Sequence, residues 1–178
     1  MQTTNQKKVS ETLRKDRETL HNRLIEAGLS PNRFHELRGT TKVAYFGFKE
    51  SQKTALELDS YPSIGVNVGN GLVIVDFDEE GYKEAHSLFN DTFTVRSGGR
   101  GKPHYYLKVV GDFSSFGSTK KLVFGDLKLK NGYCVSAGSH IDYYDETKDK
   151  RIVGNYTILK NAPIKEVAFV ENMVFIDG

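Results

Sequence analysis

The feature that most constrains this chain is a run of apolar residues that ends in carboxylates. Residues 72–75 read Leu-Val-Ile-Val, and Asp76 and Asp78 follow at alternate positions. A short apolar run rich in β-branched residues predicts a buried strand. Because side chains alternate along a strand, both acids share a face with Ile74. The alternate residues, such as Val75, lie on the other face and are expected to face the core.

The rest of the chain reads as further short strands with few helices. The spacing of apolar residues, with Ser10 before it and Gly28 after it, predicts a helix over residues 10–28. A second helix is expected over residues 82–90. Strands are expected at residues 42–48, 63–69, 92–97, 104–110, 121–130, 132–138, 154–159 and 167–176. This succession predicts an α+β domain built on a mostly antiparallel sheet.

Length and composition fit one domain and an ordinary globular protein. The 178 residues are enough to bury a core, and we expect an N-terminal amphipathic helix in residues 1–30 and a compact domain in residues 31–178. A net charge of +2 means that any signal for nucleic acid must be local. The single Cys134 excludes an internal disulfide and a cysteine-rich zinc site. No apolar run approaches the length of a membrane span, so a cytoplasmic protein without a membrane partner is expected.

Asp76 and Asp78 can act together on one cation. Alternate residues of a strand lie about 7 Å apart, so the two carboxylates can lean toward a common ion. Without a cation they would repel each other. Carboxylate oxygens suit Mg²⁺ or Mn²⁺. The alternative is that both acids lie in solvent where the strand ends.

A second polar segment, residues 95–109, combines glycine with basic residues. Its Ser-Gly-Gly-Arg-Gly stretch, residues 97–101, lets backbone N–H groups approach an anion, and Arg100 and Lys102 add positive charge. The segment leads into a strand that carries His104. A plain hairpin loop explains the same residues equally well.

A third polar segment surrounds Asp126. Asp126 and Lys128 alternate with leucines, so that the polar side chains share a face. The Asn-Gly pair at residues 131–132 predicts a two-residue hairpin turn. That turn would place Asp126 opposite Ala137 and bring residues 136–140 beside it. A cross-strand salt bridge is the alternative explanation for the acid and its lysines.

Together these segments offer acids that can hold metal ions and cations that can neutralise phosphates, which is what two-metal phosphoryl transfer requires. The order of the motifs GVNVGNGLVIVDFDEEG, TFTVRSGGRGKPHYYLK, GDLKLKNGYCVSAGSHI and GNYTIL resembles the archaeo-eukaryotic primase superfamily. Within it, the resemblance is to the primase–polymerase (prim-pol) domains of archaeal plasmids, viruses and related mobile elements, and it covers roughly residues 33–160. That family carries an Asp-x-Asp/Glu motif, a small-x-His motif and a third acid in a strand, in this order.

The resemblance implies a prim-pol fold, in which an RRM-like catalytic sheet packs against a smaller N-terminal α/β module. It implies that three acids are catalytic and hold Mg²⁺ or Mn²⁺: Asp76, Asp78 and Asp126. It implies nucleotide contacts for six further residues: His104, Arg100, Lys102, Lys128, Ser139 and His140. Candidate nucleic-acid contacts are Lys42, where the family often has a lysine in an early loop, and Lys120 and Lys121, which belong to a local excess of basic residues.

The function expected from this resemblance is template-directed nucleotidyl transfer by a DNA polymerase or primase that takes part in DNA replication. Its partners would be a primer on a single-stranded DNA template, a dNTP or NTP, and a C-terminal helical or helicase region or a separate helicase. Two alternatives stay open: a non-catalytic module that binds single-stranded DNA or an origin, and a metal-dependent nuclease. The three acids argue against a pure binder, because buried unpaired carboxylates near phosphates bring it no gain.

Overall fold

The computed structural model describes residues 9–78, 86–111, 117–122 and 125–168. These residues contain one α-helix, α1 (Glu11–Glu26), and two 3₁₀ helices, η1 (Phe48–Glu50) and η2 (Leu56–Leu58). Their strands are β1 (Phe34–Glu36), β2 (Ile64–Asn67), β3 (Leu72–Phe77), β4 (Thr94–Arg96), β5 (Pro103–Val110), β6 (Thr119–Leu122), β7 (Gly125–Lys128), β8 (Tyr133–Val135), β9 (Ser139–Asp145), β10 (Lys150–Lys160) and β11 (Lys165–Ala168).

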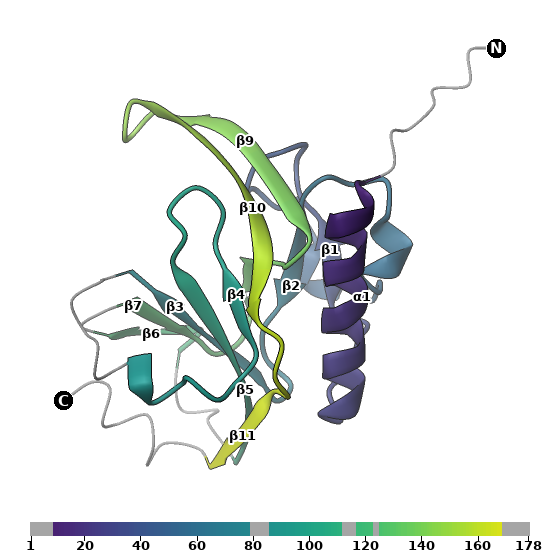
Figure 1. The fold of residues 1–178 in the computed structure, drawn as a ribbon. Helices are drawn as coiled ribbons and strands as arrows, with labels where there is room; N and C mark the ends of the chain where they lie inside the picture. Colours follow the sequence, from purple (N-terminus) through teal and green to yellow (C-terminus); the bar gives the residue numbers. More distant parts are fainter. Residues whose placement is uncertain (1–8, 79–85, 112–116, 123–124, 169–178) are drawn as a thin grey trace.

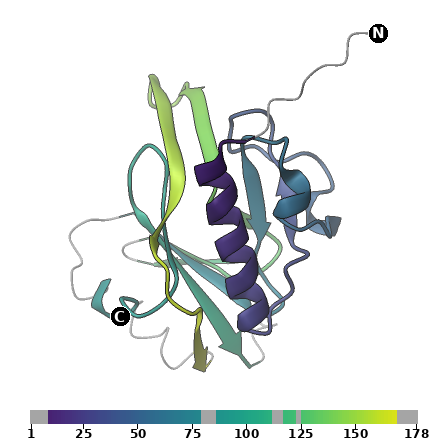
Figure 2. The same ribbon diagram turned by 45° about the vertical axis from the view of Figure 1, so that its right-hand side comes forward.

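The described strands form a large sheet and a small one. The large sheet has the order β6-β7-β3-β5-β4-β10-β9 with antiparallel neighbours, and β11 lies parallel to the second half of β5. The small sheet has the antiparallel order β1-β2-β8. Figure 1 shows the small sheet and α1 on one side of the large sheet, and Figure 2 shows α1 beside β10. The prediction of an α+β domain on a mostly antiparallel sheet is confirmed.

The helix predicted for residues 10–28 is confirmed together with both of its end signals. The Ser10 hydroxyl accepts a hydrogen bond from the Leu13 N–H at 3.4 Å, which caps the first turn. Gly28 has a φ of +73°, and the N–H of Leu29 reaches the Leu24 carbonyl at 2.9 Å. This pattern is a Schellman motif, which requires the left-handed conformation that glycine adopts without strain.

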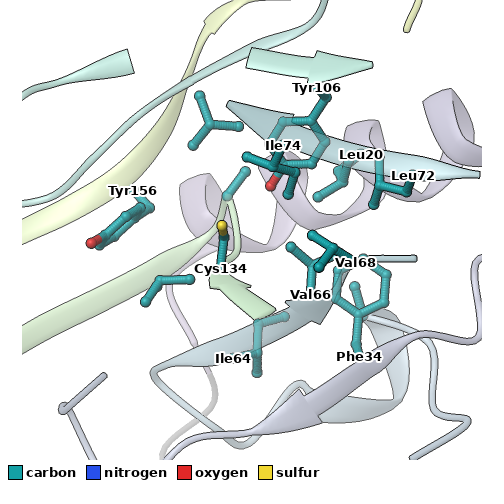
Figure 3. Packing of buried hydrophobic residues seen from close by; sticks show 14 of the residues in the cluster. Leu20, Phe34, Ile64, Val66, Val68, Leu72, Ile74, Tyr106, Cys134 and Tyr156 are labelled. Atoms are coloured by element: carbon teal, nitrogen blue, oxygen red, sulfur yellow. The ribbon is translucent and has the colours of Figure 1, made fainter. Parts of the chain in front are cut away.

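Strand β3 is buried on both faces, and each face belongs to a different hydrophobic cluster. Val75 lies in the smaller cluster, whereas Ile74 lies in the larger one, which also contains residues of α1 and of both sheets. Figure 3 shows the larger cluster, with Cys134 between Ile64 of the small sheet and Ile74 of the large sheet. The expectation that only the Val75 face is turned to the core was therefore wrong. The acid-bearing face of β3 is covered by the small sheet and the helix.

The hairpin predicted at residues 131–132 was wrong. Residues 121–130 contain two strands instead of one, since β6 and β7 pair with Lys121 opposite Asp126. Both edges of β7 are thereby occupied, by β6 and by β3. The chain after β7 leaves the large sheet, and β8 pairs with the open edge of β2. Ala137 consequently does not lie opposite Asp126.

Residues 42–48, which were predicted to be a strand, form a loop. An isolated bridge joins Ala44 to Leu37, and Gly47, with a φ of +84°, precedes η1. The side chains of Tyr45 and Phe46 are exposed, so consecutive residues point outward and no alternating buried face exists to hold a strand.

Other predicted elements differ less or lie outside the described residues. Strand β9 was not predicted. The helix expected at residues 82–90 is described only from residue 86 onward, where residues 86–87 are helical. Of the strand expected at residues 167–176, the structure describes the first two residues, which belong to β11. Within the described ranges no helix has the length and apolar character needed to cross a membrane.

The buried guanidinium of Arg17 joins α1 to two other segments of the chain. It donates hydrogen bonds to the carbonyls of Gly138 at 2.9 Å, Leu58 at 2.8 Å and Tyr61 at 2.6 Å. Burial lowers the pKa of Arg17 to about 10, while the charge of Asp59 opposes the shift. Arg17 therefore stays ionised at neutral pH and supplies donors to the Gly138 and Tyr61 carbonyls, while the Leu58 carbonyl also accepts from the Tyr61 N–H at 3.0 Å.

Replacing this side chain should destabilise the fold. Arg17→Met would remove the guanidinium donor of three carbonyls, and we expect the free energy of unfolding to fall by about 3 kcal/mol. Urea denaturation at neutral pH measures the change. Arg14→Met on the same helix is the matched control. The Arg14 side chain is 49% exposed in its ion pairs with Glu18 and Asp59, so its loss should change stability by less than about 1 kcal/mol. Equal losses in the two variants would contradict the role assigned to Arg17.

Candidate active site

Three polar side chains lie in one row across three adjacent strands. The register pairs Asp76 of β3 with His104 of β5 on one side and with Asp126 of β7 on the other. Residues directly opposite each other in antiparallel strands point to the same face. The Nε2 atom of His104 lies 3.1 Å from Oδ1 of Asp76. The row is therefore a direct result of how β3 pairs with both neighbours.

Asp76 is ionised although most of its surroundings are protein. Burial raises the pKa of Asp76, but the hydrogen bond from His104 and the positive charges of Lys128 and Lys42 act in the opposite direction. The result is a pKa below the usual value. An ionised carboxylate is an acceptor in both oxygens, which suits it to bind a cation.

Asp126 lies between two ammonium groups. Its Oδ1 is 2.7 Å from Nζ of Lys121, and its Oδ2 is 3.4 Å from Nζ of Lys128. The Asp126 side chain is 14% exposed, whereas that of Lys121 is 84% exposed. The cross-strand salt bridge considered for this segment is therefore present. One of the two lysines paired with Asp126, Lys121, lies on the surface.

A cavity of about 290 Å³, lined by residues of both sheets, lies beside this row. Asp76 and His104 line the cavity, whereas Asp126 lies outside its lining. From the large sheet and the end of β3, the cavity is lined by Asp76, Phe77, Asp78, His104 and Lys128. From the turn between β4 and β5 it is lined by Ser97, Gly98, Arg100 and Lys102. The other lining residues are Lys42, the β8 residues Tyr133, Cys134 and Val135, and Lys148, Ile152 and Tyr156 of the β9–β10 hairpin. Five cationic side chains and two carboxylates therefore face a common space.

The glycines of the turn between β4 and β5 allow it to pack against β10. A Cβ on Gly98 would lie 3.0 Å from the Gly154 backbone, and one on Gly154 would collide with Gly99. In Figure 1 this turn lies beneath the arching hairpin of β9 and β10. Among the described residues, no acceptor is bonded to the N–H groups of Gly98, Gly99 or Arg100. Consecutive N–H groups of this kind can bind an anion.

Lysines at the cavity are held close to its acids. Nζ of Lys102 donates to the backbone carbonyl of Asp78. Partial burial lowers the pKa of Lys42, the charge of Asp76 raises it, and the nearby cations Lys148 and Arg100 lower it further, so that the net shift is downward. Cations that crowd one another in this way gain from the arrival of an anion.

Some predicted site residues lie elsewhere. Ser139 is buried, and its hydroxyl donates to the Ile64 carbonyl at 3.2 Å and accepts from the Ile64 N–H at 3.1 Å, so it joins β9 to the small sheet. His140 lies beside Asn155, with Nδ1 at 2.6 Å from its Oδ1. Neither lines the cavity. The wrongly predicted hairpin explains this, because it was the hairpin that brought residues 136–140 next to Asp126.

The two lysines of β6 occupy different positions relative to Asp126. Lys121 pairs with Asp126 in the register, whereas Lys120 pairs with Leu127. Lys121 does not belong to the cavity lining. Sequence reasoning also missed three cavity residues: Tyr133, Lys148 and Tyr156. The Glu-Thr-Lys-Asp-Lys stretch (146–150) carries two lysines and two acids, so its composition gave no signal for Lys148. Nothing local indicates that the β9–β10 hairpin reaches over the site.

The carboxylate oxygens at this site are of the chemical type that binds a divalent metal. Mg²⁺ in proteins is held by one or two carboxylates, with water and substrate phosphates completing its shell. Asp76 and Asp126 are register partners on the same face and supply such a pair, and Asp78 lines the same cavity. Within the described part of the chain, no group of three or more His, Cys, Asp or Glu side chains converges on one point. A metal held by Asp76 and Asp126 would therefore need oxygens of water or of a ligand to complete its shell.

Comparison with known proteins adds no relative. No family model matches the chain, and no curated protein matches its sequence.

The lowered pKa of Asp76 predicts a specific pH dependence of stability. Because this pKa is lower in the folded than in the unfolded protein, the ionised group stabilises the fold above a pH of about 4, and this contribution is lost as the pH falls through the lower folded value. Wild type should lose more free energy of unfolding than Asp76→Asn between about pH 6 and about pH 3. Urea titrations at several pH values test this. Glu146→Gln changes an exposed acid outside the cavity, and it should lose as much free energy of unfolding at low pH as wild type does. If Asp76→Asn also loses as much as wild type, the stabilising role of ionised Asp76 is refuted.

Proposed function

We propose that the protein is a template-directed nucleotidyltransferase, a DNA polymerase or primase that transfers a nucleotide from a dNTP or NTP to the 3′-hydroxyl of a primer. The observation that carries the proposal is a cavity in which Asp76 and His104 face five cationic side chains, with Asp126 beside Asp76 in the strand register. Acids supply the ligands for metal ions, and cations neutralise a triphosphate. Phosphoryl transfer depends on both.

The acids have a defined task in this proposal. Asp76 and Asp126, with Asp78 at the end of the strand, would hold Mg²⁺ or Mn²⁺, which when bound would neutralise phosphate oxygens and favour ionisation of the 3′-hydroxyl. His104 donates to Asp76 and thereby fixes the orientation of this carboxylate. His104 is thus a positioning residue for Asp76, in addition to lining the space for the nucleotide.

The cations and the glycine turn would bind the triphosphate. Arg100, Lys102 and Lys128 line the cavity together with Lys42. The unbonded N–H groups of residues 98–100 lie in the same turn. Backbone N–H groups and ammonium groups are both good partners for phosphate oxygens. Ser139 and His140 have no part in this version of the site.

The architecture is compatible with a prim-pol domain. Such a fold needs a catalytic sheet that packs against a smaller module, with the site where the two meet. Support comes from the small sheet and α1, which cover the acid-bearing face of the large sheet, and from the cavity that lies between the two sheets. The overall sequence order of the three acid and histidine motifs supports the same family.

A primer-extension assay tests the proposal. On a primed single-stranded template with Mg²⁺ or Mn²⁺, wild type should extend the primer with dNTPs or NTPs. Asp76→Asn and Asp126→Asn should each lower the rate at least about 10²-fold, because each removes a carboxylate that would hold the metal ions on which the reaction depends. Primer–template binding should change little, since neither substitution removes a cation.

The matched control is Asp142→Asn, an acid of β9 that pairs with Arg151 at 2.6 Å and lies outside the cavity lining. It should retain wild-type extension. Template binding without any extension by wild type would favour a non-catalytic binding module. Metal-dependent shortening of the oligonucleotide would favour a nuclease.

A further inference from the structure

The loop of residues 42–46 exposes an aromatic surface that the proposed chemistry does not use. Phe46 is fully exposed, at 105%, Tyr45 is 40% exposed and Val43 is 55% exposed. Single exposed apolar residues are ordinary on protein surfaces, but three within four positions form a patch. The guanidinium of Arg38 lies 4.5 Å from the centre of the Tyr45 ring. One face of that ring is therefore already stacked on a cation.

The backbone of this loop is fixed even though its side chains face outward. The N–H of Arg38 donates to the Val43 carbonyl at 2.8 Å. The Tyr133 hydroxyl accepts from the Ala44 N–H at 3.1 Å and donates to the Lys42 carbonyl at 2.6 Å. An aromatic ring on a fixed backbone loses little conformational entropy on binding, which favours a recognition role.

The same contacts connect the loop to the candidate active site. Tyr133, which anchors the loop, also lines the cavity, and so does Lys42. The Lys42 ammonium lies 6.0 Å from the centre of the Tyr156 ring inside that cavity. The loop that carries Tyr45 and Phe46 is therefore attached through its backbone to a residue of the cavity lining, and its first residue, Lys42, belongs to that lining. Phosphates at the cations and rings beside them match the chemistry of a single-stranded nucleic acid, in which charged backbone and aromatic bases alternate.

We infer that Phe46 and Tyr45 are a stacking platform for unpaired bases of a single-stranded nucleic acid, which approaches the cavity past Lys42. The inference rests on the proposed function for the identity of the ligand. It adds a partner contact that the acids, the histidine and the glycine turn do not supply. Stacking tolerates any base, so the platform would hold the template without selecting its sequence.

The absence of tryptophan from the chain gives a direct test. Phe46→Trp creates a single indole at the platform, and Ile25→Trp creates one at a 53% exposed position near the end of α1. Titration with oligo(dT) should quench the indole fluorescence of Phe46→Trp and leave that of Ile25→Trp unchanged. An abasic deoxyribose-phosphate oligomer of equal length should bind more weakly and should not quench Phe46→Trp.

Affinity measurements separate stacking from other roles of an apolar side chain. Phe46→Ala should weaken oligo(dT) binding about tenfold, the low end of the loss expected for one base–aromatic contact. Phe46→Leu, which keeps an exposed apolar side chain but no ring, should show a similar loss. Lys42→Gln should reduce the salt dependence, with the slope of log K against log salt falling by about 0.7, whereas Phe46→Ala should leave the slope unchanged.

The outcomes distinguish this inference from the proposed function. If oligo(dT) quenches Phe46→Trp but wild type does not extend a primer, the stacking platform is supported and the proposed polymerase activity is refuted. If wild type extends a primer but Phe46→Ala binds oligo(dT) as tightly as wild type, the stacking platform is refuted and the proposed polymerase activity is supported. Wild-type affinity in Phe46→Leu, or equal quenching by the abasic oligomer, also overturns the platform.

Discussion

The pairing of β3 with a partner on each edge is the constraint on which the rest of the site depends. Because β5 and β7 both run antiparallel to β3 in a defined register, Asp76 has His104 on one side and Asp126 on the other. A shift of one residue in either pairing would move a member of the row to the opposite face. The two hydrophobic clusters oppose such a shift, since β3 buries residues of both faces.

Covering the acid-bearing face would be costly without the charges around it. Transfer of a carboxylate away from water is strongly unfavourable unless it is paired. Asp76 has a hydrogen bond from His104, and Asp126 has two ammonium partners. These contacts stabilise the ionised acids at the boundary between the sheets. They also leave the cavity with more cations than acids, which is the electrostatic setting that a polyphosphate or a nucleic-acid backbone requires.

Local signals were sufficient for several elements and failed for others. The helix was predictable because Ser10 and Gly28 act within one turn of it. The sequence indicated Asp76 as a site residue because it directly follows the apolar run of β3. The Asn-Gly pair at residues 131–132 failed as a signal, since a hairpin needs an open edge and β7 has none. Ser139 and His140 were misplaced as a consequence. Tyr133, Lys148 and Tyr156 could not be found, because they reach the cavity from the small sheet and the β9–β10 hairpin.

The sequence by itself determined the helix ends, the buried strand β3 and the presence of acids, a histidine and basic glycine-rich residues in separate segments. These follow from side-chain period, capping and turn chemistry, which act over a few residues. The tertiary structure alone decided which of those residues meet. It placed β8 in the small sheet, brought Lys42 and the β9–β10 hairpin over the acids, and turned Tyr45 and Phe46 outward. Those outcomes depend on which strand edges and which sheet faces were still open, and that is a property of the whole chain.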